Sequence, residues 1–210
     1  MLRFLIADDH TIVRRGLKQI ILDEFPSAIV EEASDAEELI KKVIGARWDV
    51  VISDLNMPGR SGLDALAQIK ISYPDLPVLI LSIHPEEQYA LRVLKGGAAG
   101  YLNKDTAPEQ LVKALQKVLL GKKYISPAVA EKLASNYTHE TTGSMHEHLS
   151  DREFDVMKLL ASGKTVSDIA DMLSLSVTTV STYRARIMDK MNLKTNSDLT
   201  KYALENHLIL

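Results

Sequence analysis

Residues 50–59 read Val50-Val51-Ile52-Ser53-Asp54-Leu55-Asn56-Met57-Pro58-Gly59, and this stretch decides how the first half of the chain is interpreted. Val50 to Ile52 are apolar and β-branched, which is typical of a parallel strand buried on both faces. Asp54 then lies at the carboxyl end of that strand, where open α/β sheets bind their ligands. The alternative is that Asp54 only initiates the turn at Pro58-Gly59. This stretch by itself supports both interpretations equally.

The composition narrows the class of protein. The chain has 210 residues, 46% of them hydrophobic, which fits one large domain or two small ones. The absence of cysteine excludes disulfides and zinc–thiolate sites and suits the reducing cytoplasm, where we expect the protein. No apolar run is as long as a membrane span, so no membrane association is expected. The net charge of −3 predicts no general affinity for nucleic acid, so any such surface must be local.

Strand and helix patterns alternate over residues 3–121. Short apolar runs predict strands at 3–7, 29–30, 50–54, 78–82 and 99–102, and helical apolar spacing predicts a helix after each. Ser34-Asp35-Ala36-Glu37 and Thr106-Ala107-Pro108-Glu109 have the pattern of capping boxes that start helices. This alternation predicts an α/β fold with a doubly wound, five-stranded parallel sheet.

Polar side chains follow four of the predicted strands, directly after each apolar run. They are Asp8 and Asp9, Asp54, Ser82 and Lys104. The carboxyl ends of parallel strands meet at one edge of such a sheet, so these side chains are predicted to form one site. Three carboxylates beside one ammonium suit a hard divalent cation, Mg²⁺ or Mn²⁺. The metal and Lys104 would neutralise a phosphoryl group arriving at Asp54, and Ser82 could donate a hydrogen bond to it.

Taken together, these residues resemble the receiver domain of two-component response regulators. The resemblance covers residues 3 to about 121 and rests on Asp8-Asp9-His10, residues 54–59, Ser82, Gly100-Tyr101-Leu102 and Lys104. It implies a flavodoxin-like receiver at residues 1–122, in which Asp54 accepts phosphate from a cognate histidine kinase. It also implies a metal site formed by Asp8, Asp9, Asp54 and the backbone carbonyl of Asn56. The residues implied to stabilise the phosphoryl group and to form the switch are Lys104, Ser82 and Tyr101.

Two positions near this site are interpreted separately. Many receivers have proline after the lysine, often following a cis bond, whereas residue 105 is aspartate here. A non-proline cis peptide costs about 2.5–4 kcal/mol, so the resemblance does not define the conformation of the loop at Lys104-Asp105. His10 is interpreted as a residue that starts a helix, in preference to a metal ligand.

The alternating pattern ends at Gly121. Ser126-Pro127 begins a predicted short helix, and residues 136–148 are polar and lack apolar periodicity, which is typical of a tether between domains. Residues 123–148 are therefore predicted to be a short helix and a flexible linker. His139, His146 and His148 lie in this segment, and we interpret their spacing as adventitious and not as a metal site.

Residues 149–210 predict a small all-α domain. Ser150-Asp151-Arg152-Glu153 has the pattern of a capping box before an apolar helix. A short helix at 166–173, a turn at 174–176 and a longer helix at 177–191 follow, with a last helix at 197–206. A short helix, a three-residue turn and a longer helix with a polar face match helix-turn-helix geometry.

The longer of these helices and the turn after it are locally basic. Between residues 178 and 194 four cationic side chains accompany one acid, Asp189. Cations and hydroxyls on one helix suit phosphate and base-edge contacts in a major groove, although an ordinary solvated face is the alternative. The residues predicted to contact double-stranded DNA are Thr178, Thr179, Ser181, Thr182, Arg184, Ala185, Arg186, Lys190 and Lys194.

This second half resembles the LuxR-type helix-turn-helix domain, and with a receiver it resembles the NarL/FixJ class of transcriptional regulators. The resemblance rests on residues 149–153, Ile169-Ala170, Leu175-Ser176, Thr179-Val180 and Tyr202-Ala203-Leu204. Relatives usually read DNA at the positions of Ser181, Thr182 and Ala185, often with Lys or Asn at the first two. Here all three are small, so we expect fewer direct hydrogen bonds to bases and more reliance on Arg184, Arg186 and Lys190.

Three functions are compatible with these patterns. The leading hypothesis is a DNA-binding regulator switched by phosphorylation, homodimeric when phosphorylated and without turnover of an external substrate. The second is a Mg²⁺-dependent phosphatase or phosphotransferase that uses Asp54 as its nucleophile. Such enzymes usually carry a second aspartate two residues later, where this chain has Asn56. The third is a receiver whose second domain binds protein.

Overall fold

The computed structural model describes residues 1–57, 61–131, 145–206 and 208–209. The predicted Pro58-Gly59 turn, His139 and most of the predicted tether lie outside these residues. The chain divides into two compact units, Met1–His139 and Glu140–Leu210. In the described part of the chain, no helix combines the length and the apolar character that a bilayer span requires.

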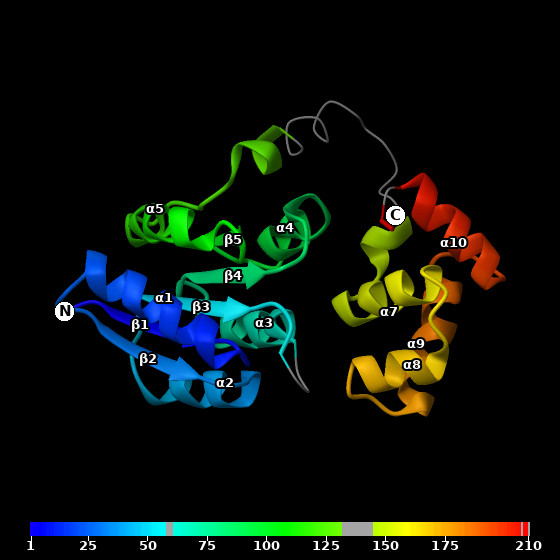
Figure 1. Cartoon of the computed structure of the whole chain (residues 1–210), viewed down its shortest axis with the longest axis horizontal. Helices are drawn as coiled ribbons and strands as arrows, with labels where there is room; N and C mark the ends of the chain where they lie inside the picture. The colour runs from blue at the N-terminus through cyan, green and yellow to red at the C-terminus, as the bar shows by residue number, and fades with distance from the viewer. Residues whose placement is uncertain (58–60, 132–144, 207, 210) are drawn as a thin grey trace. The chain divides into compact units, whose positions relative to one another are not determined.

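The first unit is built on a parallel sheet whose described strands lie in the order β2-β1-β3-β4-β5 (Figure 1). This confirms the predicted doubly wound α/β fold. The strands are β1 Arg3–Ala7, β2 Ile29–Ala33, β3 Val50–Asp54, β4 Val78–Ser82 and β5 Gly100–Asn103. The helices between and after them are α1 Thr11–Glu24, α2 Ala36–Gly45, α3 Gly62–Ser72, α4 Glu86–Lys95 and α5 Ala107–Leu119.

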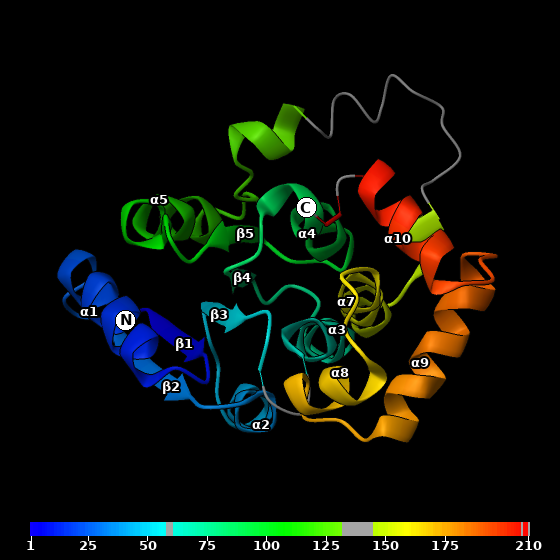
Figure 2. The same cartoon turned by 45° about the vertical axis from the view of Figure 1, so that its right-hand side comes forward.

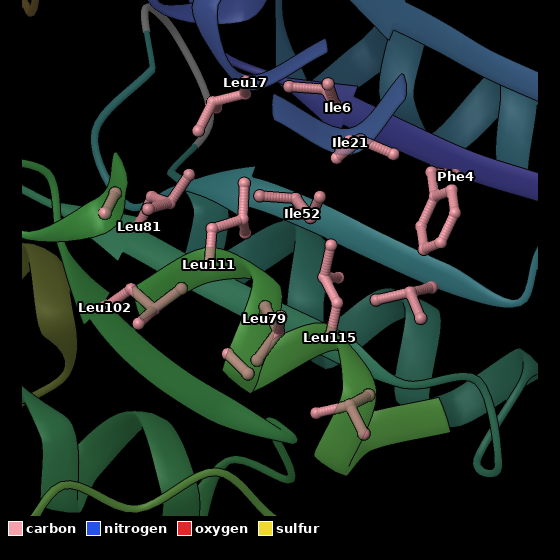
Figure 3. Packing of buried hydrophobic residues seen from close by; sticks show 14 of the residues in the cluster. Phe4, Ile6, Leu17, Ile21, Ile52, Leu79, Leu81, Leu102, Leu111 and Leu115 are labelled. Carbon is pink, nitrogen blue, oxygen red and sulfur yellow. The ribbon is translucent and has the colours of Figure 1, made fainter. Parts of the chain in front are cut away.

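Helices cover both faces of this sheet, which explains why its central strands are apolar on both sides. Figure 2 shows α1 and α5 on one side and α2, α3 and α4 on the other. Strands β3 and β4 are buried along their whole length. Figure 3 shows the core between the sheet and helices α1 and α5, where Ile52 and Leu79 lie beside Ile21, Leu111 and Leu115.

Two of the predicted capping boxes do not form in the structure. Asp35, and not Ser34, caps α2, because its carboxylate accepts hydrogen bonds from the backbone N–H groups of Glu37 and Glu38. Ser34 instead donates to the side chain of Glu38 through its N–H and its hydroxyl. Thr106 precedes α5 without a side-chain cap bond, since its hydroxyl donates to the carbonyl of Asn103 at 3.3 Å.

The chain after α5 adds a contact to the sheet edge that the sequence pattern did not indicate. Tyr124 forms an isolated parallel bridge with Gly100, and its N–H donates to the carbonyl of Ala99 at 2.8 Å. A Cβ on Gly100 would lie 2.8 Å from the carbonyl oxygen of Tyr124, so only glycine permits this approach. Residues 127–131 are helical, as predicted for the short helix after Ser126.

The second unit is helical, with its core at Phe154, Ile169, Val180 and Ile187. Its elements are the 3-10 helix η1 Met145–His148, α7 Asp151–Ala161, α8 Val166–Met172, α9 Val177–Lys190 and α10 Asn196–Glu205 (Figure 1). The predicted capping box at Ser150 and Glu153 is present at the start of α7. Ser174 has a φ of 53°, a left-handed conformation that reverses the chain between α8 and α9.

Residues 145–148, predicted to belong to the tether, are instead part of this second unit. Nδ1 of His146 lies 2.8 Å from the hydroxyl oxygen of Tyr202 on α10. The His146 ring also packs against Phe154 of α7, with 5.8 Å between the ring centroids. The prediction was wrong for these four residues because a short 3-10 turn carries no apolar periodicity.

Candidate functional site

The carboxyl ends of the strands bring an acidic cluster and one lysine together. The ammonium nitrogen of Lys104 lies 2.7 Å from Oδ2 of Asp8 and 2.8 Å from Oδ2 of Asp54. Carboxylate oxygens of Asp8, Asp9 and Asp54 and a ring nitrogen of His10 all lie within 4.8 Å of one another. Residues at the ends of three strands, spread over the chain from Asp8 to Lys104, therefore share one site.

The backbone around Asp54 depends on one glycine. Gly62 opens α3, and its N–H donates to the carbonyl of Leu55 at 2.8 Å. A Cβ on Gly62 would lie 1.9 Å from the backbone oxygen of Asp54, well inside van der Waals contact. The helix can therefore begin directly beneath the acidic cluster only because residue 62 has no side chain.

Burial sets the ionisation of the central pair. Asp54 is 4% exposed, and its burial raises the pKa of the carboxyl group to about 6, although Lys104 opposes this shift. The charge of Asp8 adds to the increase. Burial opposes the charge on Lys104 as well, but its contacts with Asp54 and Asp8 outweigh that effect and raise the pKa of the ammonium. The cluster thus holds more negative charge than one lysine neutralises.

The donor set fits a hard divalent cation. Oδ2 of Asp8 is buried and has no partner with hydrogen-bond geometry among the described residues, although the Lys104 ammonium lies nearby. Three carboxylates supply the oxygen ligands that Mg²⁺ and Mn²⁺ prefer. His10, at the start of α1, places Nδ1 at 2.8 Å from Asp9 and 3.2 Å from Asp8. Its side chain is two-thirds exposed, at the rim of the cluster.

The loop that presents Lys104 is defined by Asn103. The peptide bonds of the described residues are trans, including the one between Lys104 and Asp105. The side-chain oxygen of Asn103 accepts from the N–H of Asp105 at 2.8 Å, and its carbonyl accepts from the N–H of Thr106 at 3.2 Å. The Lys104 N–H donates to the carbonyl of Ser82 at 2.8 Å. An Asx turn thus takes the place of the proline found in many receivers.

Ser82 and Tyr101 meet at the backbone of His84, in the loop between β4 and α4. The His84 N–H donates to the hydroxyl oxygen of Ser82 at 3.1 Å, and the Tyr101 hydroxyl donates to the His84 carbonyl at 2.7 Å. Tyr101 is 3% exposed. The Tyr101 ring therefore lies inside the protein in this structure.

His84 also contacts Asn56, two residues after Asp54. Nε2 of His84 and Nδ2 of Asn56 are 2.8 Å apart, so the amide donates when that ring nitrogen is unprotonated. The His84 ring stacks on Tyr89 of α4, with 4.7 Å between centroids. His84 was not predicted as a site residue, because a histidine in a loop carries no spacing signal until the loop is folded.

In the second unit, α9 carries the predicted DNA-contacting residues at the surface. Thr178, Ser181, Thr182, Ala185 and Arg186 are exposed, Thr179 and Arg184 are partly exposed, and Lys194 is exposed in the following turn. Nε of Arg184 donates to Oδ1 of Asn196 at the start of α10, at 3.0 Å. The predicted residues are thus at least partly exposed, and Thr178, Ser181, Thr182, Ala185 and Arg186 share one face of the helix.

Lys190 differs from the other cations of α9, because its ammonium nitrogen lies 2.6 Å from Oε2 of Glu153. Glu153 is 2% exposed and is the capping-box residue of α7, where it also accepts from the Ser150 N–H. Its burial opposes ionisation, but the bonds from Lys190 and Ser150 outweigh burial and hold the pKa of Glu153 below its usual value. The Lys190 ammonium is thus engaged within the unit.

The fold and the site define a class of protein in which a doubly wound domain with an acidic strand-end site is joined to a helix-turn-helix unit. Residues 4–116 match the family model of the response regulator receiver domain, and residues 147–203 match that of the bacterial regulatory proteins of the luxR family. The chain therefore belongs to the NarL/FixJ-class response regulators, which join a receiver to a LuxR-type DNA-binding domain.

Known proteins are similar to the chain over nearly its whole length. The oxygen regulatory protein NreC of Staphylococcus carnosus is 37% identical, over 99% of this chain and 99% of that protein. The response regulator UvrY of Escherichia coli is 36% identical, over 99% and 96% respectively. The response regulator GacA of Pseudomonas viridiflava is 34% identical, over 100% and 98%.

Solved structures of a related regulator match as well. A structure of RcsB from Salmonella enterica serovar Typhimurium, bound to the promoter rprA with the phosphomimetic BeF3−, is 29% identical with a TM-score of 0.62. The match covers 96% of this chain and 98% of the RcsB chain. An RcsB–DNA complex is also 29% identical, with a TM-score of 0.57 and 96% of both chains covered.

Proposed function

We propose that Asp54 is the phosphoacceptor of this response regulator and that a histidine kinase supplies the phosphate. The observation that carries this proposal is the position of Lys104, whose ammonium lies within 2.8 Å of both Asp54 and Asp8 at the strand ends. A buried carboxylate with an adjacent cation can receive a phosphoryl group, because that cation offsets the charge gained. We place the protein in the cytoplasm, where the DNA and the phosphate donor are found.

The side chains divide the work of phosphoryl transfer. An Asp54 oxygen attacks phosphorus, forming an O–P bond as the N–P bond to the kinase histidine breaks, and the imidazole leaves with its electron pair. Lys104 then pairs with the phosphoryl oxygens, and the Ser82 hydroxyl donates to one of them. Asp8, Asp9, Asp54 and the backbone carbonyl of Asn56 would hold Mg²⁺ or Mn²⁺. When bound, this cation neutralises charge on the transferred group.

Turnover of an external phosphoester is not part of this function. Aspartate phosphatases usually carry an acid two residues after the nucleophile, whereas Asn56 cannot exchange a proton and its amide contacts His84. We propose that the aspartyl phosphate is lost slowly, without catalysis toward other substrates.

The output of the switch is proposed to be DNA binding by the second unit. Exposed hydroxyls and arginines on α9 suit phosphates and base edges in a major groove, and the related RcsB is solved in complex with promoter DNA. A homodimer would place two such helices on half-sites about one helical turn, roughly 10 bp, apart. Phosphorylation would favour the state with higher DNA affinity. A protein-binding output domain remains the alternative.

One experiment tests both halves of the proposal. The full chain is treated with acetyl phosphate and Mg²⁺, and its intact mass and its affinity for random-sequence duplex DNA are measured together. We expect one added phosphate and tighter binding, neither of which occurs in Asp54→Asn. Asp75→Asn, which changes an exposed carboxylate that precedes β4 and is not at a carboxyl end of a strand, is the matched control and should behave as the unmodified chain does. Phosphate on Asp54→Asn would refute the assignment, and failure to bind any duplex would refute the output.

A further inference from the structure

One stripe of the exposed surface of α9 is formed by small side chains, three of which carry a methyl group. Thr178, Ser181, Thr182 and Ala185 are all exposed and follow one another at helical spacing, so they lie on one stripe. Val177, at the first position of the helix, is 50% exposed beside them. A ligand that approaches this stripe meets methyl groups at every position except Ser181.

The hydroxyl groups on and beside this stripe are partly committed to the protein itself. The Thr182 hydroxyl donates to the backbone carbonyl of Thr178, one turn earlier, at 3.0 Å. The hydroxyls of Thr179 and Ser176 bond each other at 2.7 Å, and Ser176 also accepts from the Thr179 N–H. Thr182 can therefore still accept a hydrogen bond but presents its methyl group as the free surface.

A shallow hollow and flanking charge define what fits against the stripe. Ser176, Thr178, Thr179, Thr182, Tyr183 and Arg186 line a surface hollow of about 320 Å³. Arg186 is exposed in the lining of the hollow, and Lys194 is exposed in the turn after the helix, so the charge of this surface favours a polyanion. Methyl groups between cations are complementary to a major groove, whose edge carries phosphates outside and the thymine C5-methyl group inside.

We propose that Thr178, Thr182 and Ala185 select DNA by apolar contact with thymine C5-methyl groups. This specificity rests on the proposed function of the second unit as a DNA-binding domain. Methyl contact takes the place of the hydrogen bonds that longer side chains on such a helix would make to base edges, and it predicts half-sites that contain thymines at the positions facing α9.

The test uses the full chain treated with acetyl phosphate and Mg²⁺, and a duplex enriched by binding from a pool with a random core. Each thymidine of the enriched duplex is replaced in turn by deoxyuridine, which removes the C5-methyl group and keeps the base pairing. We expect at least one position in each half-site at which this replacement weakens binding about fourfold, the effect of one buried methyl group.

Protein variants connect each sensitive thymine to a side chain. Thr178→Ser and Thr182→Ser remove a methyl group but keep the hydroxyl, and Ala185→Gly removes the third methyl. In each variant we expect one deoxyuridine position to lose its effect, because the protein methyl that it faced is already missing. A deoxyuridine effect that persists at every position in all three variants would assign the effect to DNA shape and overturn the inference.

Two other outcomes distinguish a failure of methyl recognition from a failure of the proposed DNA binding. Equal affinity for thymidine and deoxyuridine duplexes would overturn methyl recognition and leave DNA binding intact. Failure to enrich any duplex would overturn both.

Discussion

The hydroxyl of Tyr101 donates a hydrogen bond of 2.7 Å to the backbone carbonyl of His84, two residues after Ser82. The side-chain amide of Asn103 reaches the same carbonyl at 3.3 Å. Since the His84 N–H donates to Ser82 and its ring contacts Asn56, this one residue joins β5 to the end of β4 and to the loop after β3. The backbone of His84 thus links the Ser82 hydroxyl to the Tyr101 hydroxyl through the two peptide groups that flank its Cα.

Tyr101→Phe should weaken this connection without creating a cavity. The loss of one buried hydrogen bond predicts a decrease of about 0.5–1.5 kcal/mol in the free energy of unfolding. Urea unfolding followed by Trp48 fluorescence measures it, because Trp48 is the chain's one tryptophan and is buried in the first unit. We also expect a smaller ratio between the DNA affinities of phosphorylated and unphosphorylated protein.

Tyr124→Phe is the matched control for this variant. It removes a hydroxyl that donates to the side chain of Gln110 at 3.0 Å, away from the carboxyl ends of the strands. It should reduce stability by a similar amount and leave the affinity ratio unchanged. Equal affinity ratios in both variants would exclude the His84 carbonyl from the switch.

Asp54→Asn should stabilise the metal-free protein at neutral pH. The pKa of Asp54 is raised from 3.8 to about 6, so its ionisation costs folding free energy. The stability of the unmodified chain should fall as the pH rises from about 4 through about 6, whereas this contribution is absent from the Asn variant. Above pH 7 the variant should be more stable by up to about 3 kcal/mol, and below pH 4 the difference should vanish.

The measurement is urea unfolding in EDTA, followed through Trp48 from pH 4 to pH 8. Addition of Mg²⁺ should then stabilise the unmodified chain more than Asp54→Asn, because ligand that binds only the folded state raises its stability. A stability difference that does not change with pH would show that burial of Asp54 is not the cause.

Gly62→Ala should disturb the backbone of the phosphoacceptor. The new Cβ would approach the backbone oxygen of Asp54 to 1.9 Å, so α3 or the end of β3 must move. We expect a loss of about 2 kcal/mol or more in the free energy of unfolding and slower labelling by acetyl phosphate. Gly45→Ala, whose Cβ meets nothing within 4 Å, should be neutral or stabilising. Equal behaviour of the two variants would contradict the close approach.

The residues at the strand ends could be grouped from the sequence because each follows an apolar run, and parallel strands bring such positions together whatever the details of packing. The same reasoning placed the five strands of the sheet and the helix-turn-helix. It depends only on hydrophobic periodicity, which local sequence carries.

The features that the sequence did not reveal lie where neighbouring residues compete or where the partner is distant. Ser34 and Asp35 are both good caps, and the structure selects Asp35. His84 acts through its backbone in a loop, and Lys190 is paired across 37 positions with Glu153. Such contacts are set by tertiary packing, so composition and spacing do not reveal them. Lys190 was predicted to contact DNA from local charge, and its contact with Glu153 makes that assignment testable.

Lys190→Ala should act mainly on the stability of the second unit. It leaves a buried carboxylate at Glu153 without its cation, which predicts a loss of about 1–3 kcal/mol, less than for a fully buried pair because the Lys190 side chain is 40% exposed. The pKa of the Glu153 carboxyl group is lowered in the folded protein. The ion pair with Lys190 therefore stabilises the fold when the pH is above the ordinary pKa of glutamate, and this stabilisation is lost as the pH falls through the lowered pKa of Glu153. Hydrogen exchange of the amides in α7 and α9, measured at pH 7, reports this loss directly.

Arg186→Ala provides the comparison, because Arg186 is exposed on the face of α9 that carries Thr182. It should leave hydrogen exchange unchanged and reduce the slope of log affinity against log salt by about one, as expected for a lost phosphate contact. Lys190→Ala should show the opposite pattern, with faster exchange and nearly the same salt slope. If Lys190→Ala instead lowers the slope as Arg186→Ala does and leaves exchange unchanged, its ammonium binds phosphate, and the contact with Glu153 is incidental.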